Sequence, residues 1–423
     1  MTQRSEIDRL LTDWQGRPSV AVIDLDQLRV NIGTLRGMIG DDVRFMAVVK
    51  ADGYGHGSIP VAKAALRAGV DELAVATVEE GARLRAHGVT APILVLGPIG
   101  ELERRRAISQ DLMLVVADLA FAEALAADVR GSGRKGPLDV HLKIDTGMHR
   151  FGVEPEAAVS LARAIHGARE LRLAGVMTHF ASADDPDPAY TEEQVRVFDR
   201  VVEAIRSEGI DVGTQHLANS AATMRFPELH RDRVRIGIAM YGLQPDGSMP
   251  LPPPMRPIMT VHSRVARVVE LEPGDKVSYG GTWTAENATR VGLVPIGYAD
   301  GYRRQGSNLA WMDLDGDRVP VRGRICMDQT LVEVGPDARR GDLVTVIGNG
   351  ETSVAPTLDQ LAEMYGTISH ELPTNLVVQR LAHLYIQGGE LVAVSDLWGY
   401  RELDEGAFAQ APVKGEPVAA AAE

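Results

Sequence analysis

Short apolar runs alternate with stretches of helical periodicity over the first 240 residues. The runs lack the polar alternation of half-exposed strands, which is typical of strands buried on both faces of a parallel sheet. Between them, Thr77 and Glu80 have the spacing of a helix capping box, and Gly88 fits the left-handed position after that helix. Strands are expected at 19–25, 44–50, 72–76, 92–96, 112–116, 139–145, 173–179, 214–218 and 234–239. Eight or nine βα repeats favour an α/β fold with a TIM-like (β/α)8 barrel over an open sheet.

The pattern changes after the proline-rich stretch SMPLPPPMRP, which predicts an extended linker. Beyond it, short turn-bounded β runs predict a mainly antiparallel β domain, interrupted by one helix at Leu358–Tyr365. We therefore expect an N-terminal segment (1–18) packed on the β domain, a barrel (19–248), a linker (249–257), the β domain (258–402) and a disordered tail (403–423).

Composition narrows the class of protein. The 423 residues carry a net charge of −14, which argues against nucleic acid or an anionic membrane as the main partner. Cys326 is the only cysteine, so no intramolecular disulfide can form, and we read it as a buried structural thiol. The chain has neither an apolar run long enough for a membrane helix nor a secretory signal. A cytoplasmic protein is expected.

Lys50 is the first residue with a chemical signal. It follows four apolar residues at a predicted strand end, where a barrel gathers its functional groups. Such a lysine is either a snorkelling side chain or a desolvated amine, whose lowered pKa suits it to form a Schiff base. The glycine-rich sequence around Tyr54, just after it, leaves room for a ligand close to the backbone.

Eight motifs in this chain resemble those of the alanine racemase family, in the family's order over about residues 20–350. They are VVKADGYGHG, KIDTGMHRFG, GVMTHFASAD, HLANSAA, VRIGIAMYGL, VSYGGTW, VPIGYADGY and GRICMDQ. The resemblance implies a pyridoxal phosphate (PLP)-dependent, fold-type III enzyme that interconverts L- and D-alanine as a cytoplasmic homodimer with shared sites. D-Alanine would serve peptidoglycan precursor synthesis or a related pathway.

The resemblance also implies the catalytic roles. Lys50 would carry PLP and act as one base, and Tyr279, supplied by the partner subunit, would act as the other on the opposite face. Racemisation needs a proton removed on one face and delivered on the other, which suits such a pair. His179 would contact both the tyrosine and Arg235, and Arg235 would bind the pyridine nitrogen.

The remaining positions follow from the same motifs. Arg150 would contact the PLP oxygen and the substrate carboxylate, and Lys143 is a carbamate, a neutral amine or an ion pair. The Met327 backbone would hold the substrate carboxylate, with Asp328 organising its loop. Asn219 and Ser220 could equally be a plain helix N-cap. The phosphate would be bound by Tyr54, Asn219, Ser220, Gly237 and Ile238, and the substrate entrance lined by Asp184, Tyr298 and Arg324.

One departure from the family motifs suggests an alternative substrate. Relatives commonly have a phosphate-contacting tyrosine where this chain has His370. A shorter, ionisable side chain suggests a roomier or more polar pocket that accepts serine or another small amino acid. A barrel that binds PLP without turnover is a third hypothesis, but such relatives lack the β domain and its tyrosine. The acidic stretch 184–187 fits no EF-hand spacing, so no metal site is expected.

Overall fold

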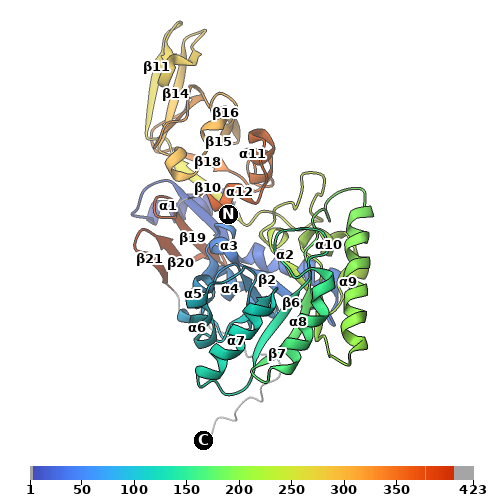
Figure 1. Ribbon diagram of the computed structural model, residues 1–423. Coiled ribbons are helices and arrows are strands. Elements are labelled where there is room, and N and C mark those ends of the chain that lie inside the picture. Colours follow the sequence, from blue (N-terminus) through green and yellow to red (C-terminus); the bar gives the residue numbers. More distant parts are fainter. Residues whose placement is uncertain (1–2, 377, 404–423) are drawn as a thin grey trace, which may run out of the picture.

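The computed structural model describes residues 3–376 and 378–403, with side chains from Ile7 onward. Its central element is an eight-stranded, all-parallel sheet in the order β8-β7-β6-β5-β4-β3-β2-β9, nearly closed into a barrel (Figure 1). Between β8 and β9, Arg235 N donates to Ala218 O at 3.0 Å. The strands are β2 (Arg44–Val48), β3 (Glu72–Val75), β4 (Ile93–Val95), β5 (Met113–Val116), β6 (Leu138–Lys143), β7 (Leu171–Met177), β8 (Thr214–His216) and β9 (Arg233–Ile236).

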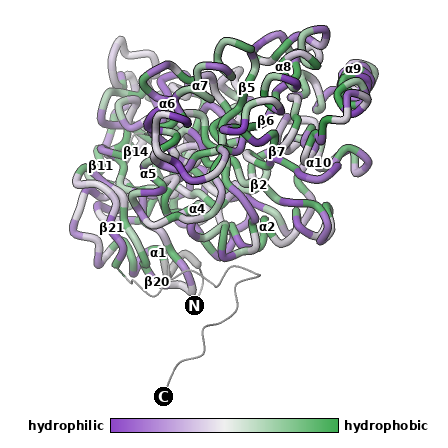
Figure 2. The backbone as a smooth tube through the Cα atoms, turned by 60° about the horizontal axis from the view of Figure 1, so that its bottom comes forward, coloured by the Kyte–Doolittle hydropathy of each residue, from purple (hydrophilic) through white to green (hydrophobic). Residues whose placement is uncertain are grey.

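Helices surround the barrel because each has one apolar face. In α9, Phe198, Val202 and Ile205 are buried, and hydrophobic and hydrophilic residues alternate along its length in Figure 2. The capping box of Thr77 and Glu80 is confirmed at the start of α5. The barrel helices are α2 (Leu25–Ile39), α4 (Ser58–Arg67), α5 (Val78–Ala86), α6 (Glu101–Ser109), α7 (Leu119–Gly131), α8 (Pro155–Gly167), α9 (Ala189–Ser207) and α10 (Ser220–Arg225).

The expected strand at 19–25 forms as β1 (Val20–Asp24), but its placement in the barrel is wrong. It is antiparallel to β10 (Met259–Arg264) and parallel to β19 (Ala382–Gln387) in a second sheet. That sheet has the order β16-β15-β18-β10-β1-β19-β20-β21. Its other members are β15 (Trp311–Leu314), β16 (Asp317–Pro320), β18 (Leu343–Ile347), β20 (Glu390–Asp396) and β21 (Gly399–Glu402).

The mainly antiparallel character of the C-terminal part, which we define as residues 258–403, is confirmed. A three-stranded sheet, β11 (Arg267–Leu271), β14 (Thr289–Val294) and β17 (Thr330–Val334), extends from it, away from the barrel in Figure 1. A small hairpin pairs β12 (Lys276–Val277) with β13 (Trp283–Thr284). The expected helix forms as α11 (Leu358–Tyr365), and the short α12 (Glu371–Thr374) follows.

Segments outside these sheets pack against both parts of the molecule, α1 on the second sheet and the linker on a barrel helix. Ile7 and Leu11 of α1 (Gln3–Asp13) pack with Val20 of β1 and Leu384 of β19. In the linker, the carbonyl of Arg256 accepts a hydrogen bond from buried Asn31 of α2 at 2.9 Å. Beyond Leu403, the predicted disordered tail lies outside the described residues. Of the helices that the structure describes, none has the length and apolar character of a membrane span.

Candidate active site

Lys50 lies on an unusual turn of the backbone. The expected strand ends earlier, at Val48, and Lys50 opens the short α3 (Lys50–Tyr54). Ala51, Asp52, Gly53 and Tyr54 follow with left-handed φ values of 52°, 51°, 65° and 52°. Non-glycine residues adopt this conformation only at a cost in energy, so it persists where other contacts hold it.

Side chains from neighbouring helices supply those contacts. The Asp52 carboxylate accepts hydrogen bonds from the backbone and hydroxyl of Ser58, at 2.9 and 3.0 Å, and pairs with Arg83 at 3.0 Å. Glu80 accepts from the backbone N–H of Ala51 at 2.7 Å. The turn therefore presents Lys50 in a fixed direction at the carboxyl end of β2.

The electrostatics of Lys50 favour the desolvated amine over the snorkelling side chain. Burial and the Arg150 guanidinium lower the pKa of the Lys50 amine, and Glu80 only partly opposes the shift. The amine nitrogen lies 5.9 Å from the centre of the Tyr54 ring. A lysine with a lowered pKa has more of the neutral, nucleophilic amine at pH 7.

Other basic groups converge on the same place. Lys143, at the end of β6, is 6 % exposed, and its amine lies 5.0 Å from the centre of the Phe151 ring. Burial, Arg235 and Arg150 lower the pKa of Lys143 to about 8. Burial and these neighbouring cations also hold the pKa of His179 well below its ordinary value. The mutual repulsion of these groups would be relieved by a bound anion.

Arg235 is buried inside the barrel in a cage of carbonyl groups. Its guanidinium donates to the carbonyls of His216 at 2.6 Å, Thr178 at 2.7 Å and Leu217 at 3.1 Å. Nη2 also lies 3.3 Å from Nδ1 of His179. Burial and Arg233 lower the pKa of Arg235 to about 9, so Arg235 remains protonated at neutral pH.

Two histidines that had no predicted role, His216 and His141, support Arg235. Nη1 of Arg235 lies 3.1 Å from Nδ1 of His216, and Nε2 of His216 lies 2.9 Å from Nδ1 of His141. Because the guanidinium can only donate, His216 accepts at Nδ1 and carries its proton at Nε2, facing His141. The available signal was a histidine within a predicted strand: His216 is the last residue of β8, and His141 lies in the middle of β6.

The predicted phosphate-binding positions meet at the start of α10 and just after β9. The Ser220 hydroxyl accepts from the backbone N–H of Gly237 at 3.1 Å, which leaves its own hydrogen for a ligand. A Cβ at Gly237 would lie 2.5 Å from the Tyr54 hydroxyl, so only glycine fits there. Ile238 follows at the start of a 3-10 turn. Asn219 accepts from Ala222 N at 3.0 Å, the plain N-cap role.

His370 lies against this group, 6.1 Å from the Tyr54 ring. Burial and Lys50 lower the pKa of His370, which favours its neutral form. Nδ1 of His370 is buried with no hydrogen-bond partner among the described residues. Tyr241, which also had no predicted role, has its ring centre 5.1 Å from that of Tyr54 and donates to the Val48 carbonyl at 3.1 Å.

Tyr279, Met327, Asp328 and Tyr298 belong to the C-terminal part. Tyr279 is 71 % exposed and Met327 53 % exposed. Tyr279 follows Ser278, whose hydroxyl donates to the Arg324 carbonyl at 2.6 Å. Cys326 is half-buried rather than buried, with its sulfur 3.4 Å from the Ser278 hydroxyl. Among the described residues, no hydrogen bond, ion pair or ring contact joins these four residues to Lys50.

The donor set of the barrel fits pyridoxal phosphate. The Lys50 amine, whose pKa is lowered, can form a Schiff base with the aldehyde of this cofactor. The surrounding cations and the Ser220 hydroxyl suit its anionic phosphate. Arg235 offers a fixed donor, and the unpartnered nitrogen of His370 lies at the same place. Lys50, Tyr54, Ser220, Gly237 and Arg235 are therefore the residues that could hold it.

Family models and curated relatives of this chain all point to one family. The model of the alanine racemase N-terminal domain matches residues 23–245, and that of the C-terminal domain matches residues 258–385. The alanine racemase of Desulfovibrio desulfuricans is 39 % identical over 88 % of this chain and 99 % of its own length. That of Symbiobacterium thermophilum is 41 % identical over 88 % and 98 %.

Solved structures agree with these relatives. The structure of alanine racemase from Clostridium difficile 630 matches with a TM-score of 0.84 and 34 % identity, over 90 % of this chain and 99 % of that one. The match extends over both the barrel and the C-terminal part.

Proposed function

The chain belongs to the alanine racemase family, and on that premise we propose that it interconverts L- and D-alanine with pyridoxal phosphate bound at Lys50. The observation that carries the proposal is the Lys50 amine at one end of the barrel, with its pKa lowered by burial and Arg150, beside the further cations Lys143 and Arg235. When bound, pyridoxal phosphate supplies an electron sink for the charge that develops when the substrate Cα loses its proton.

Two residues of the chain move that proton. We assign Lys50 to one face of the substrate and Tyr279 to the other, because inversion needs proton removal and delivery on opposite faces. A phenol has an ordinary pKa of about 10, so Tyr279 needs positive neighbours to act as a base. Arg235 is the positive neighbour we propose, and neutral His179, whose Nδ1 lies 3.3 Å from Arg235, would donate a hydrogen bond to the phenolate through its other ring nitrogen.

Arg235 would meet the pyridine nitrogen as a hydrogen-bond donor. Its pKa of about 9 keeps the guanidinium charged at neutral pH, so it would not give a proton to that nitrogen. An unprotonated ring is a weaker electron sink, which disfavours transamination as a side reaction. His216 and the carbonyl cage fix the guanidinium in this role.

The substrate carboxylate would be bound by Arg150 and by the backbone N–H of Met327, with Asp328 organising the turn and Tyr298 at the entrance. Tyr54, Asn219, Ser220, Gly237, Ile238 and His370 would surround the phosphate, Asn219 through the N-cap of α10. Lys143, with a pKa of about 8, holds a fraction of neutral amine that could react with carbon dioxide to give a carbamate facing Arg150.

We also propose a head-to-tail homodimer. The strong exposure of Tyr279 and Met327 in the single chain supports a site completed by the partner subunit's copy of this surface. A cytoplasmic enzyme that supplies D-alanine for peptidoglycan precursors accords with the single cysteine and with the family.

The test is chiral chromatography after incubation of the PLP-loaded enzyme with L-alanine and, separately, with L-serine. We expect rapid inversion of alanine and little of serine, since the serine alternative rested on His370 and finds no support in the relatives. The Lys50→Ala variant should invert neither amino acid. Equal inversion of serine, or no inversion of alanine, would overturn the assignment of the substrate.

A further inference from the structure

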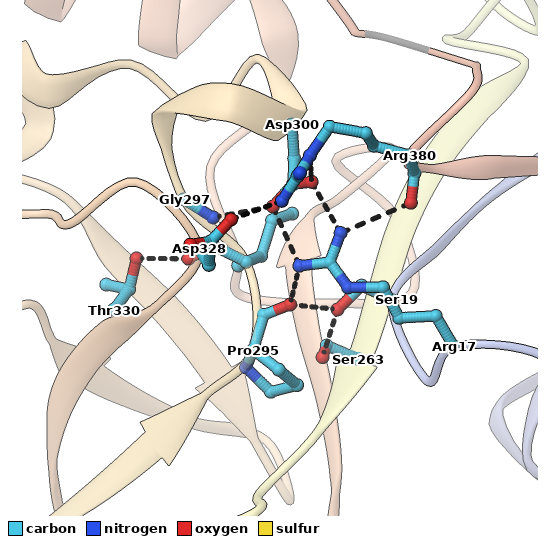
Figure 3. A network of polar contacts seen from close by, with 10 residues as sticks. Arg17, Ser19, Ser263, Pro295, Gly297, Asp300, Asp328, Thr330 and Arg380 are labelled. Carbon is cyan, nitrogen blue, oxygen red and sulfur yellow. Dashed lines mark hydrogen bonds and ion pairs between the residues drawn. The ribbon is translucent and has the colours of Figure 1, made fainter.

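A buried carboxylate, Asp300, ties the N-terminal segment to the C-terminal part (Figure 3). The Asp300 side chain is fully buried and receives Arg17 bidentately, with distances of 2.5 and 2.9 Å. Arg380 donates to the same carboxylate at 3.0 Å, and Gly297 donates its backbone N–H at 2.9 Å. Paired, hydrogen-bonded charges of this kind fix the geometry of the groups that carry them.

The same segment also holds the backbone next to Asp300. Arg17 donates to the carbonyl of Pro295 at 2.5 Å, and Ser19 donates to it at 2.7 Å. The Thr330 hydroxyl donates to the neighbouring carbonyl of Ile296 at 2.7 Å. The connection from β14 to the turn at Tyr298–Asp300 is therefore bound at successive positions.

That turn is joined directly to the turn that carries Met327. Tyr298 N donates to Cys326 O, and Ala299 N donates to Met327 O, each at 3.0 Å. The two backbones approach so closely that a Cβ at Gly297 would lie 2.3 Å from the Cys326 carbonyl. A displacement of residues 297–300 would thus displace Met327.

Arg380 makes a second connection, from the Asp300 carboxylate to the far side of the Met327 turn. Its Nη2 donates to Asp328 while its Nε binds Asp300. The Asp328 and Arg380 side chains are 53 % and 40 % exposed. An ion pair this exposed contributes little to folding stability, so its main effect is on the position of the turn.

We propose that Arg380, anchored on Asp300 by Arg17, is a positioning residue for substrate binding: it fixes the Met327–Asp328 turn so that its backbone N–H meets the substrate carboxylate in the partner's site. The inference rests on the proposed function. Arg17 precedes the residues matched by the model of the N-terminal domain, which begin at residue 23. The N-terminal segment thereby contributes to the geometry of the site without touching the substrate.

The test uses mixed dimers with two affinity tags. One subunit carries Lys50→Ala and the other Tyr279→Phe, so the only complete site combines Lys50 of the second with Tyr279 of the first. Arg380→Gln is then added to either subunit. On the subunit with intact Tyr279, we expect KM for alanine to rise about tenfold and kcat to change less than about threefold.

On the subunit with Tyr279→Phe, Arg380→Gln should leave KM unchanged, because the Met327–Asp328 turn of that subunit belongs to the site that carries both inactivating substitutions. PLP affinity, measured by absorbance, should stay constant in every dimer. Arg401→Gln is the matched control, since Arg401 is about as exposed as Arg380 and also makes an ion pair with an aspartate, Asp396, on the β20–β21 hairpin. Asp328→Asn, a milder change, should reproduce the rise in KM where Arg380→Gln fails to fold.

The positioning role would be overturned if KM were the same with Arg380→Gln on either subunit, or if kcat alone fell. Loss of PLP affinity in parallel with the rise in KM would do the same, because it would indicate general damage. If the parental mixture without Arg380→Gln has no activity, the shared site itself is refuted, and this inference with it.

Discussion

At the scale of single residues, the close fit between Gly237 and Tyr54 has a measurable consequence. A Cβ at position 237 would lie 2.5 Å from the Tyr54 hydroxyl, so Gly237→Ala must displace the ring. We expect PLP affinity to fall about tenfold or more, because misplacing a binding group by a fraction of an ångström is costly. Absorbance titration of the apoenzyme with PLP measures it.

The matched control for Gly237 is Gly247→Ala, in an exposed turn just before the linker where a Cβ meets nothing within 4 Å. It should bind PLP as the wild type does. Equal affinity in both variants would show that Tyr54 does not contribute to the phosphate site.

Most of the candidate site on the barrel could be predicted from the sequence. Lys50, Lys143 and His179 are brought together because they lie at the carboxyl ends of β2, β6 and β7, which meet at one end of the nearly closed barrel. His216 and Tyr241 could not be assigned in the same way. Each acts through another residue, His216 on Arg235 and Tyr241 on Tyr54, and such contacts depend on packing between segments distant in sequence.

At the scale of elements, the misplaced strand β1 shows where hydrophobic pattern fails. Its residues are buried on both faces, as in a parallel barrel strand, because β1 is central in the second sheet between β10 and β19. The pattern reports burial and period, but not the sheet to which a strand belongs. The left-handed turn after Val48 was also missed, since Ala51 and Asp52 give no local signal for it.

The hairpin of β20 and β21 lies beyond the residues matched by the model of the C-terminal domain, which end at residue 385. Val394 of β20 is 1 % exposed and packs with Ile7 and Leu384, whereas Trp398 at the hairpin tip is 86 % exposed. Val394→Ala should lower the free energy of unfolding by about 1–3 kcal/mol through loss of buried contacts. Urea denaturation measures this change.

Trp398→Ala is the control on the same hairpin, and it should leave the urea midpoint unchanged. If Val394→Ala is equally neutral, the hairpin is an appendage that does not belong to the cooperative core.

At the scale of the whole molecule, two buried histidines lie where the barrel meets the second sheet. His56 follows the Lys50 turn and His383 lies on β19, and the two are 0 % and 1 % exposed. Burial lowers the pKa of His56 to about 3 and that of His383 to about 4. Both are therefore neutral in the folded protein at pH 7.

The unfolded chain binds a proton at His383 below pH 6.5, while the folded chain resists protonation until about pH 4. Stability is thus lost as pH falls through this window, by about 3 kcal/mol for this residue. His383→Leu should narrow the difference in melting temperature between pH 7 and pH 4.5. The same substitution at exposed His166 should leave that difference as it is, and equal effects of the two would contradict the account.

The most direct test of the central claim, proton transfer by Lys50 and Tyr279 on opposite faces of alanine, is hydrogen exchange at Cα in D₂O. The Tyr279→Phe enzyme, loaded with PLP, is incubated separately with L- and D-alanine, and deuterium at Cα and enantiomeric composition are measured. We predict loss of inversion with both enantiomers, while one of them, whose proton faces Lys50, still exchanges with solvent. Retained inversion, or equal exchange of both enantiomers, would contradict the two-base site.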